Sequence, residues 1–209
     1  MAFFLVLIWT TKEQLSQGKL GGRRGSSACT IIAMLVAEIV SKCCKLILPH
    51  SGRLCDRWSY AIAEAISEGN SIYDGYVDKP GILLDVHDVG EIFKRNLTKH
   101  YVHISETKPV WLSPSSDPFT CTFCYNLAQF SLLRGQNFAV FICHKKSFLF
   151  VSDGSGKVLV IDTHFHADTN SGTYFIFGEA DEVAFYFTKK YPGKTVGTLT
   201  EISFVVVVD

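Results

Sequence analysis

The segment from Cys29 to Leu46 constrains the fold of this chain more than any other part of the sequence. Its pattern predicts a helix with apolar side chains on nearly every side. Those side chains are Ile31, Ile32, Met34, Leu35, Val36, Ile39 and Val40. A helix that is apolar all round has to be enclosed by other elements. The chain has 209 residues, 47% of them hydrophobic, which is enough for one such core. We therefore expect residues 1–209 to form a single domain.

The spacing of apolar residues divides the rest of the chain into a first half with mainly helical periodicity and a second half with mainly strand periodicity. In the first half we expect further helices at 56–67, 85–94 and 121–133, turns at 68–81 and a loop at 108–118. In the second half we expect strands at 137–143, 147–152, 157–162, 173–177 and 202–208, a hairpin turn at 144–146 and a surface helix at 179–190. Early strands are expected at 3–9 and 101–104. This order indicates an α+β fold, in which an N-terminal helical half packs on a C-terminal antiparallel sheet.

The charge balance excludes several classes of partner. Twenty basic and 20 acidic residues give a formal net charge of zero. A nucleic-acid-binding protein would show a basic surface, and a protein bound to an anionic membrane would show a basic patch. The apolar run Phe3–Trp9 is too short to span a bilayer and is expected to be a buried strand. We expect a monomer that binds neither nucleic acid nor membrane.

The seven cysteines are odd in number and scattered, which favours a reducing compartment and a cytoplasmic location. The glycosylation triplet Asn96-Leu97-Thr98 points the other way, and we interpret it as a coincidence. Cys121 and Cys124 form a CxxC pair that could be half of a zinc site. A closed zinc site needs four ligands and no second pair is present, so we expect ordinary buried thiols there.

Cys29 stands where a Gly-rich loop becomes the buried helix, and Ser26 or Ser27 is the expected N-cap. A helix N-terminus carries partial positive charge and N–H groups without intrahelical acceptors. These groups favour a thiolate and can stabilise an oxyanion formed beside it. A buried, inert cysteine is the competing interpretation of this position.

Asp162-Thr163-His164 follows a predicted strand. Residues i and i+2 of a strand share a face, so the carboxylate and the imidazole are expected to be neighbours at an exposed strand end. A carboxylate beside a histidine selects its tautomer and stabilises the imidazolium. Together with Cys29, the pair favours nucleophilic catalysis, with Cys29 as nucleophile, His164 as base and Asp162 as orienting residue.

Other histidines offer alternatives. His166 could replace His164 as the base, with Asp162 or Asp168 as its orienting residue, whereas His144 lies in a predicted turn and is expected to be exposed. His164, His166 and Asp162 could also bind a metal with His87, but a chance cluster is the favoured interpretation.

Two blocks of this sequence resemble the active-site segments of herpesvirus large tegument protein deubiquitinases and of their cellular and bacterial relatives. The residues concerned are Gln17-Gly18, Leu20-Gly21, Gly25, Ala28-Cys29-Thr30 and Leu159–His164. The viral enzymes usually have Gln directly before the cysteine, and Ala28 in that position favours the non-viral branch.

The resemblance implies a papain-like cysteine peptidase that needs no metal or organic cofactor. It implies that Cys29 is the nucleophile, that Asp162 and His164 supply orienting residue and base, and that a glutamine upstream donates to the oxyanion. That glutamine is Gln17, with Gln14 as the alternative. The implied activity is thiol-dependent cleavage after the C-terminal Gly-Gly of ubiquitin, with ubiquitin or polyubiquitin chains as partners.

Alternative functions remain open at this point. The chain could act on another ubiquitin-like modifier, or it could be a non-catalytic ubiquitin-binding module with a decayed site. Because ubiquitin has an apolar patch and a basic tail, acidic residues are expected on the binding face, with Asp74, Asp78 and Glu106 as candidates. The basic pair Arg23-Arg24 is expected to be solvated, although it could contact an acidic partner.

Overall fold

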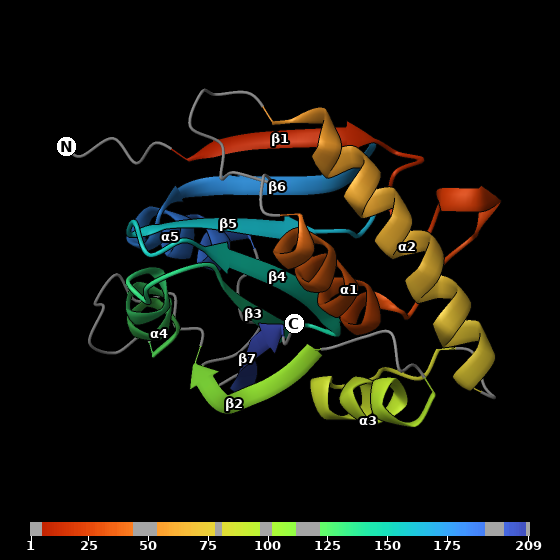
Figure 1. Cartoon of the computed structure of the whole chain (residues 1–209). Coiled ribbons are helices and arrows are strands. Elements are labelled where there is room, and N and C mark those ends of the chain that lie inside the picture. Colours follow the sequence, from red (N-terminus) through yellow and green to blue (C-terminus); the bar gives the residue numbers. More distant parts are fainter. Residues whose placement is uncertain are drawn as a thin grey trace.

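The structure is a computed structural model that describes residues 6–43, 54–77, 81–96, 102–111, 122–190 and 199–207. One seven-stranded sheet runs through it, in the order β1-β6-β5-β4-β3-β7-β2, and each neighbouring pair of strands is antiparallel (Figure 1). The strands are β1 (Leu7–Lys12), β2 (Val102–Trp111), β3 (Asn137–Cys143), β4 (Lys146–Ser152), β5 (Lys157–Asp162), β6 (Ser171–Glu179) and β7 (Leu199–Val207). The helices are α1 (Cys29–Lys42), α2 (Asp56–Tyr76), α3 (Val86–Asn96), α4 (Thr122–Ser131) and α5 (Ala180–Lys190), with a short 3-10 helix at Leu20–Gly22.

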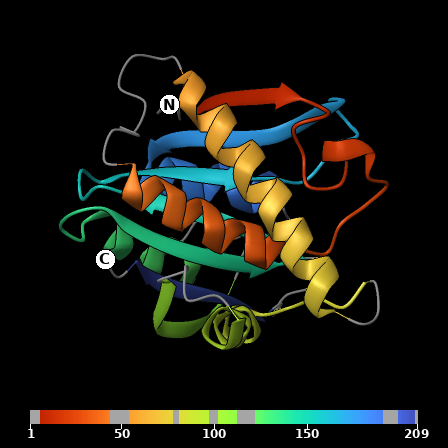
Figure 2. The same ribbon diagram turned by 45° about the vertical axis from the view of Figure 1, so that its right-hand side comes forward.

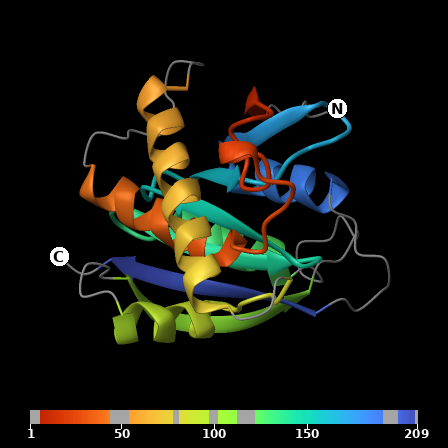
Figure 3. The ribbon, with the colours of Figure 1, turned by 90° about the vertical axis from the view of Figure 1, so that its right-hand side faces the viewer.

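Helices cover both faces of the sheet. On one face, α1 lies across the strands with α2 beside it, and α4 and α5 pack on the other (Figures 2 and 3). Alternate residues of each central strand therefore enter different cores: in β4, Leu149 packs toward α1 and Phe150 toward α5. Burial on both faces explains why these strands read as continuous apolar runs. The α+β class and the helical half packed on an antiparallel sheet are confirmed.

The first helix is as deeply buried as its sequence predicts. Eleven of its residues are buried, from Cys29 to Val40. The helix ends at Lys42 with Cys43 as its C-cap residue, earlier than the expected end at Leu46, and residues 44–46 lie outside the described part of the chain.

The second helix is much longer than the sequence indicated. A turn-rich segment was expected at 68–81, but α2 continues to Tyr76. Gly69 is required inside this helix, because an added Cβ would lie 2.6 Å from Cγ1 of Ile32 on α1. The glycine that reads as a helix breaker thus allows α1 and α2 to approach closely. The prediction of a helix end at 67 was wrong.

The loop expected at 108–118 was also wrong in its first part, since β2 runs on to Trp111 and pairs Pro109 with Glu201 of β7. β2 is the last strand of the sheet, and an edge strand tolerates a residue that cannot donate a ladder hydrogen bond. The N-terminal strand also differs from the prediction. β1 begins at Leu7 on the opposite edge, and its Ile8 is 42% exposed, so it is not the buried strand that was expected.

Local signals in the second half were accurate. β3 and β5 have the predicted bounds, and the hairpin turn is formed by His144 and Lys145, both with positive φ. The helix expected at 179–190 is α5, although its inner side is buried rather than exposed. None of the described helices combines the length and hydropathy needed to cross a membrane.

Candidate active site

Cys29 is the first residue of α1 and is only 4% exposed. The loop before it turns sharply with Gly21, Gly22 and Gly25, all at positive φ. Neither Ser26 nor Ser27 caps the helix as expected: the N-cap residue is Ala28, and no side chain caps it. The first turn of α1 therefore keeps backbone N–H groups that lack an intrahelical acceptor, beside the thiol.

Asp162 and His164 form the pair that the sequence indicated. β5 ends at Asp162, whose carboxylate is fully buried, and Oδ1 lies 2.6 Å from Nδ1 of His164. The same oxygen accepts a 3.0 Å hydrogen bond from the backbone N–H of His164. The chain thus turns at the strand end, and this turn rather than a shared strand face brings the ring to the carboxylate. The side chain of His164 is only 12% exposed, so it is mostly buried and not at an exposed strand end.

The imidazole of His164 meets the thiol of Cys29, so two segments far apart in sequence form one site. Burial on its own would raise the pKa of the thiol, but the hydrogen bond and charge of His164 outweigh this effect and lower the pKa. Burial opposes the charged imidazole, while Asp162 and Cys29 favour it and raise the pKa of His164 to about 9. These shifts favour a thiolate–imidazolium pair, the reactive form of such a site.

Asp162 remains a carboxylate despite its burial. Burial would raise its pKa, but hydrogen bonds and charge from His164 and His166 hold that pKa well below the usual range. A permanently ionised carboxylate can stabilise the imidazolium throughout a reaction.

Sequence reasoning missed Ser147, which lies at the start of β4 and is buried. Its hydroxyl and backbone interact with Cys29 and help to lower the pKa of the thiol. The hydroxyl also lies 2.8 Å from Oγ1 of Thr30. The only sequence signal was a serine at the start of an apolar strand, which is too common to indicate a site.

Gln17 is buried beside the same segments. Its backbone N–H donates to the Thr163 carbonyl at 2.9 Å, and its Oε1 accepts from Oγ1 of Thr163 at 3.1 Å. Its Nε2 donates to the Ser26 carbonyl at 3.3 Å, three residues before Cys29. The amide of Gln17 is thus held between the loop that enters α1 and the residue that separates Asp162 from His164.

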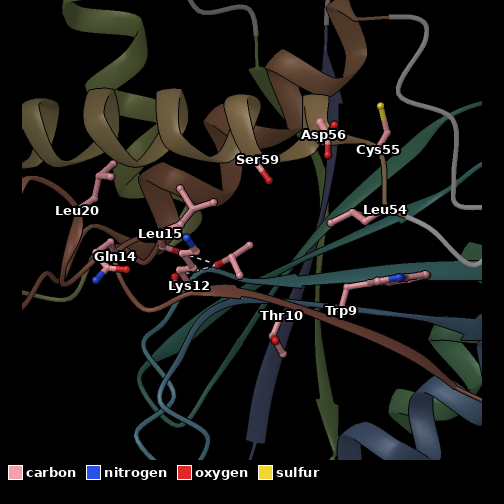
Figure 4. A pocket seen from close by; sticks show the side chains of 11 residues that line it. Trp9, Thr10, Lys12, Gln14, Leu15, Leu20, Leu54, Cys55, Asp56 and Ser59 are labelled. Carbon is pink, nitrogen blue, oxygen red and sulfur yellow. Dashed lines mark hydrogen bonds between the residues drawn. The ribbon is translucent and has the colours of Figure 1, made fainter.

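Gln14, the alternative to Gln17, is exposed and donates to Oε1 of Glu13 at 3.4 Å. It lines a cavity of about 670 Å³ between β1 and the first turn of α2, together with Trp9 and Leu54 (Figure 4). Neither Cys29 nor His164 lines this cavity, so the structure brings Gln17, and not Gln14, to the Cys29 segment.

His166, the alternative base, lies beside Oδ2 of Asp162, the carboxylate oxygen that His164 does not contact. Its Nε2 is 3.1 Å from Oδ2, and its buried ring stacks on Tyr174 with the ring centroids 3.8 Å apart. The two histidines thus flank one carboxylate from opposite oxygens, and only His164 interacts with Cys29.

The remaining candidates lie elsewhere. His144 is exposed in the hairpin turn, and His87 lies 3.3 Å from Oγ1 of Thr107. Among the described residues, no group of three or more His, Cys, Asp or Glu side chains is arranged to hold a metal ion. Cys121 lies outside the described residues, and so do Leu97 and Thr98 of the glycosylation triplet.

The acidic residues expected to contact a basic tail are only partly described. The Asp74 carboxylate accepts from both terminal nitrogens of Arg23, at 2.6 and 3.0 Å. The pair lines a cavity of about 410 Å³ next to Ser26 and Ser27. Arg23 is thus paired rather than simply solvated. Asp78 and the side chain of Glu106 lie outside the described part of the chain.

No family model and no curated protein matches this sequence. Among solved structures, the chain is similar to the ubiquitin-specific protease encoded by the murine cytomegalovirus tegument protein M48, which was solved in complex with a ubiquitin-based suicide substrate. The match has a TM-score of 0.57 at 9% sequence identity and covers 95% of this chain and 84% of that chain. At this identity the similarity establishes a shared fold, that of a papain-like protease.

Proposed function

We propose that residues 1–209 form one catalytic domain of a thiol-dependent deubiquitinase, which cleaves after the C-terminal Gly-Gly of ubiquitin. The observation that carries the proposal is the contact between Cys29, at the start of a buried helix, and a histidine held by Asp162. The fold shared with a ubiquitin-specific protease supports it. The described cysteines are all free, which fits the reducing cytoplasm.

In the proposed mechanism, the Cys29 thiolate attacks the carbonyl carbon of the terminal glycine of ubiquitin, which is bonded to the nitrogen of a lysine side chain. The oxyanion accepts hydrogen bonds from the Cys29 backbone N–H and from Nε2 of Gln17. His164 donates its proton to the leaving lysine amine, the C–N bond breaks, and a thioester remains on Cys29. His164 then takes a proton from water as the hydroxyl attacks, and the ubiquitin carboxylate leaves.

His166 is proposed to position Asp162 rather than to act as the base. Since Asp162 Oδ1 is engaged by His164, a second imidazole on Oδ2 prevents the buried carboxylate from rotating. We propose that Asp74 contacts the basic tail of ubiquitin only if the tail displaces Arg23. The guanidinium of Arg23 already donates hydrogen bonds to both carboxylate oxygens of Asp74.

A ubiquitin derivative with an electrophile at its C-terminus tests the proposal. The wild-type protein is expected to form a covalent adduct, detected as a mass increase of one ubiquitin. Cys29→Ala is expected to abolish the adduct, and Cys55→Ala is the matched control because Cys55 is exposed and lines a cavity that neither Cys29 nor His164 lines.

Labelling that survives Cys29→Ala would refute Cys29 as the nucleophile. Labelling by another ubiquitin-like modifier, but not by ubiquitin, would keep the thiol chemistry and refute the substrate. Binding of ubiquitin without hydrolysis would instead identify a non-catalytic module.

A further inference from the structure

Asn70 is a buried polar residue in the part of α2 that the sequence did not predict to be helical. Its side chain, 5% exposed, faces the loop before Cys29 instead of solvent. Nδ2 donates to the backbone carbonyl of Gln17 at 3.1 Å, and Oδ1 accepts from the hydroxyl of Ser26 at 2.6 Å. Because a carbonyl can only accept, the contact with Gln17 determines which end of the amide is the nitrogen.

These contacts continue to the start of α1. Since the Ser26 hydroxyl donates its single proton to Asn70, its lone pairs are left to accept, and it receives the backbone N–H of Ala28 at 3.1 Å. The carbonyl of the same serine receives Nε2 of Gln17. One asparagine thus holds both the Gln17 segment and the residues directly before Cys29.

We infer that Asn70 is a positioning residue for the oxyanion site, which it builds by fixing Gln17 and the first N–H groups of α1 relative to each other. The inference rests on the proposed function, because it assumes that Cys29 attacks a carbonyl. Asn70 transfers no proton and touches no substrate. This positioning matters because the two proposed donors to the oxyanion come from separate segments. Gln17 precedes a Gly-rich loop and Cys29 follows it.

An asparagine is the side chain that this arrangement requires. Asn70→Asp keeps the size and the acceptor for Ser26, but it loses the donor for the Gln17 carbonyl. Asn70→Ala loses both. A misplacement of about 1 Å in a catalytic group can cost roughly a hundredfold in rate. We expect both variants to lower kcat by roughly tenfold to a hundredfold while KM changes little.

Two reactions of Cys29 separate positioning from general damage. Hydrolysis, measured with ubiquitin carrying a C-terminal fluorogenic amide and with p-nitrophenyl acetate, passes through an oxyanion. Alkylation by iodoacetamide does not, and its rate depends on the thiolate that His164 stabilises. Both variants are expected to hydrolyse the two substrates roughly tenfold to a hundredfold more slowly but to keep an alkylation rate within about twofold of wild type. Ser71→Ala, an exposed change at the next position of α2, is the control and should leave both reactions unchanged.

A double-mutant cycle tests whether Asn70 acts through Gln17. If it does, adding Asn70→Ala to Gln17→Ala lowers kcat by much less than the product of the two single effects. Full multiplicativity would overturn the inference, and so would an unchanged kcat in Asn70→Asp and Asn70→Ala. Equal losses of alkylation and hydrolysis would also overturn it, because they would show general disruption of the site.

The outcomes also separate this inference from the proposed function. If ubiquitin is not cleaved but ester hydrolysis depends on Cys29 and Asn70, the substrate is wrong and the role of Asn70 stands. If ubiquitin is cleaved equally well by the Asn70 variants, the function stands and the inference fails. A wild-type protein that hydrolyses neither substrate refutes both. Kinetics are taken below the melting temperature of each variant, which circular dichroism determines.

Discussion

The thiol of Cys29 shows how strongly its surroundings control a residue's chemistry. Cys143 is also buried in this protein, and there burial acts unopposed and raises the pKa of the thiol to about 12. At Cys29 the same penalty is outweighed by the hydrogen bond and charge of His164. The pKa values of the two buried thiols therefore shift in opposite directions, because Cys29 faces the imidazole of His164 whereas Cys143 is affected by burial alone.

The alkylation of Cys29 should follow pH accordingly. In the wild type the iodoacetamide rate is expected to rise with a midpoint below pH 9.0, the ordinary thiol value. In His164→Ala burial is opposed only by the hydrogen bonds of Ser147, so the midpoint should rise above that of the wild type. Mass spectrometry of the Cys29 peptide over a pH series measures both midpoints. Identical midpoints in the two proteins would contradict the proposed ion pair.

The role of His166 is tested by comparing it with His164. His166→Ala leaves one oxygen of the buried Asp162 without its neighbour, which is expected to lower kcat by roughly tenfold and the free energy of unfolding by about 1–3 kcal/mol. His164→Ala removes the proposed base and should lower kcat by roughly 10³-fold or more. Ubiquitin-amide hydrolysis and urea unfolding measure the two effects. A larger loss of kcat in His166→Ala would reverse the assignment of the base.

At the scale of elements, the contact between α1 and α2 decides the geometry of the site. α1 carries Cys29, α2 carries Asn70, and Gly69 lies where the two helices touch. Sequence patterns located α1 well because its apolar residues surround it. They ended α2 too early, because glycine and asparagine have low helix propensity and together indicate a turn. The sequence does not show that a neighbouring helix needs the glycine at this position.

Two glycines of α2 offer a matched test of that contact. Gly69→Ala would place a Cβ 2.6 Å from Ile32, whereas Gly75→Ala meets nothing within 4 Å. We expect Gly69→Ala to lower the free energy of unfolding by about 1–3 kcal/mol and Gly75→Ala to raise it by about 0.5–1 kcal/mol. Urea unfolding followed by fluorescence measures both. Stabilisation by both substitutions would mean that the helices do not meet at Gly69.

At the scale of the whole molecule, the sheet connects the two halves of the site. Cys29 comes from a helix on one face, His164 follows the end of β5, and Ser147 is the second residue of β4. The central strands are buried under helices on both sides, whereas β1 forms an edge of the sheet.

Amide hydrogen exchange should reflect this arrangement. Backbone amides of β4 and β5 are expected to exchange most slowly, because only global unfolding exposes strands that are paired on both sides and covered on both faces. Amides of β1, which has one free edge, should exchange faster. Mass spectrometry of peptic peptides measures the rates, and equally slow exchange in β1 and β5 would contradict the strand order.

Several signals confined to a few neighbouring residues were reliable in the sequence, although the expected cap at Ser26 or Ser27 and the expected turns at 68–81 were not. A helix was expected to begin at residue 85, and Asp85 caps α3 by accepting the backbone N–H of Asp88 at 2.8 Å. Cys29 at a loop–helix junction and Asp162 beside His164 were recognised for the same reason: each motif needs only a short stretch of chain.

Contacts between distant segments were decided by the tertiary structure alone. Ser147 bonds Thr30 across 117 residues, and Asn70 reaches Ser26 across 44, so no local pattern could reveal either one. The choice of Gln17 over Gln14 depends on Thr163, which is 146 residues away. Local chemistry and hydrophobic periodicity thus determine which elements form and which residues can react. Which of those residues meet depends on how the helices and strands pack in three dimensions.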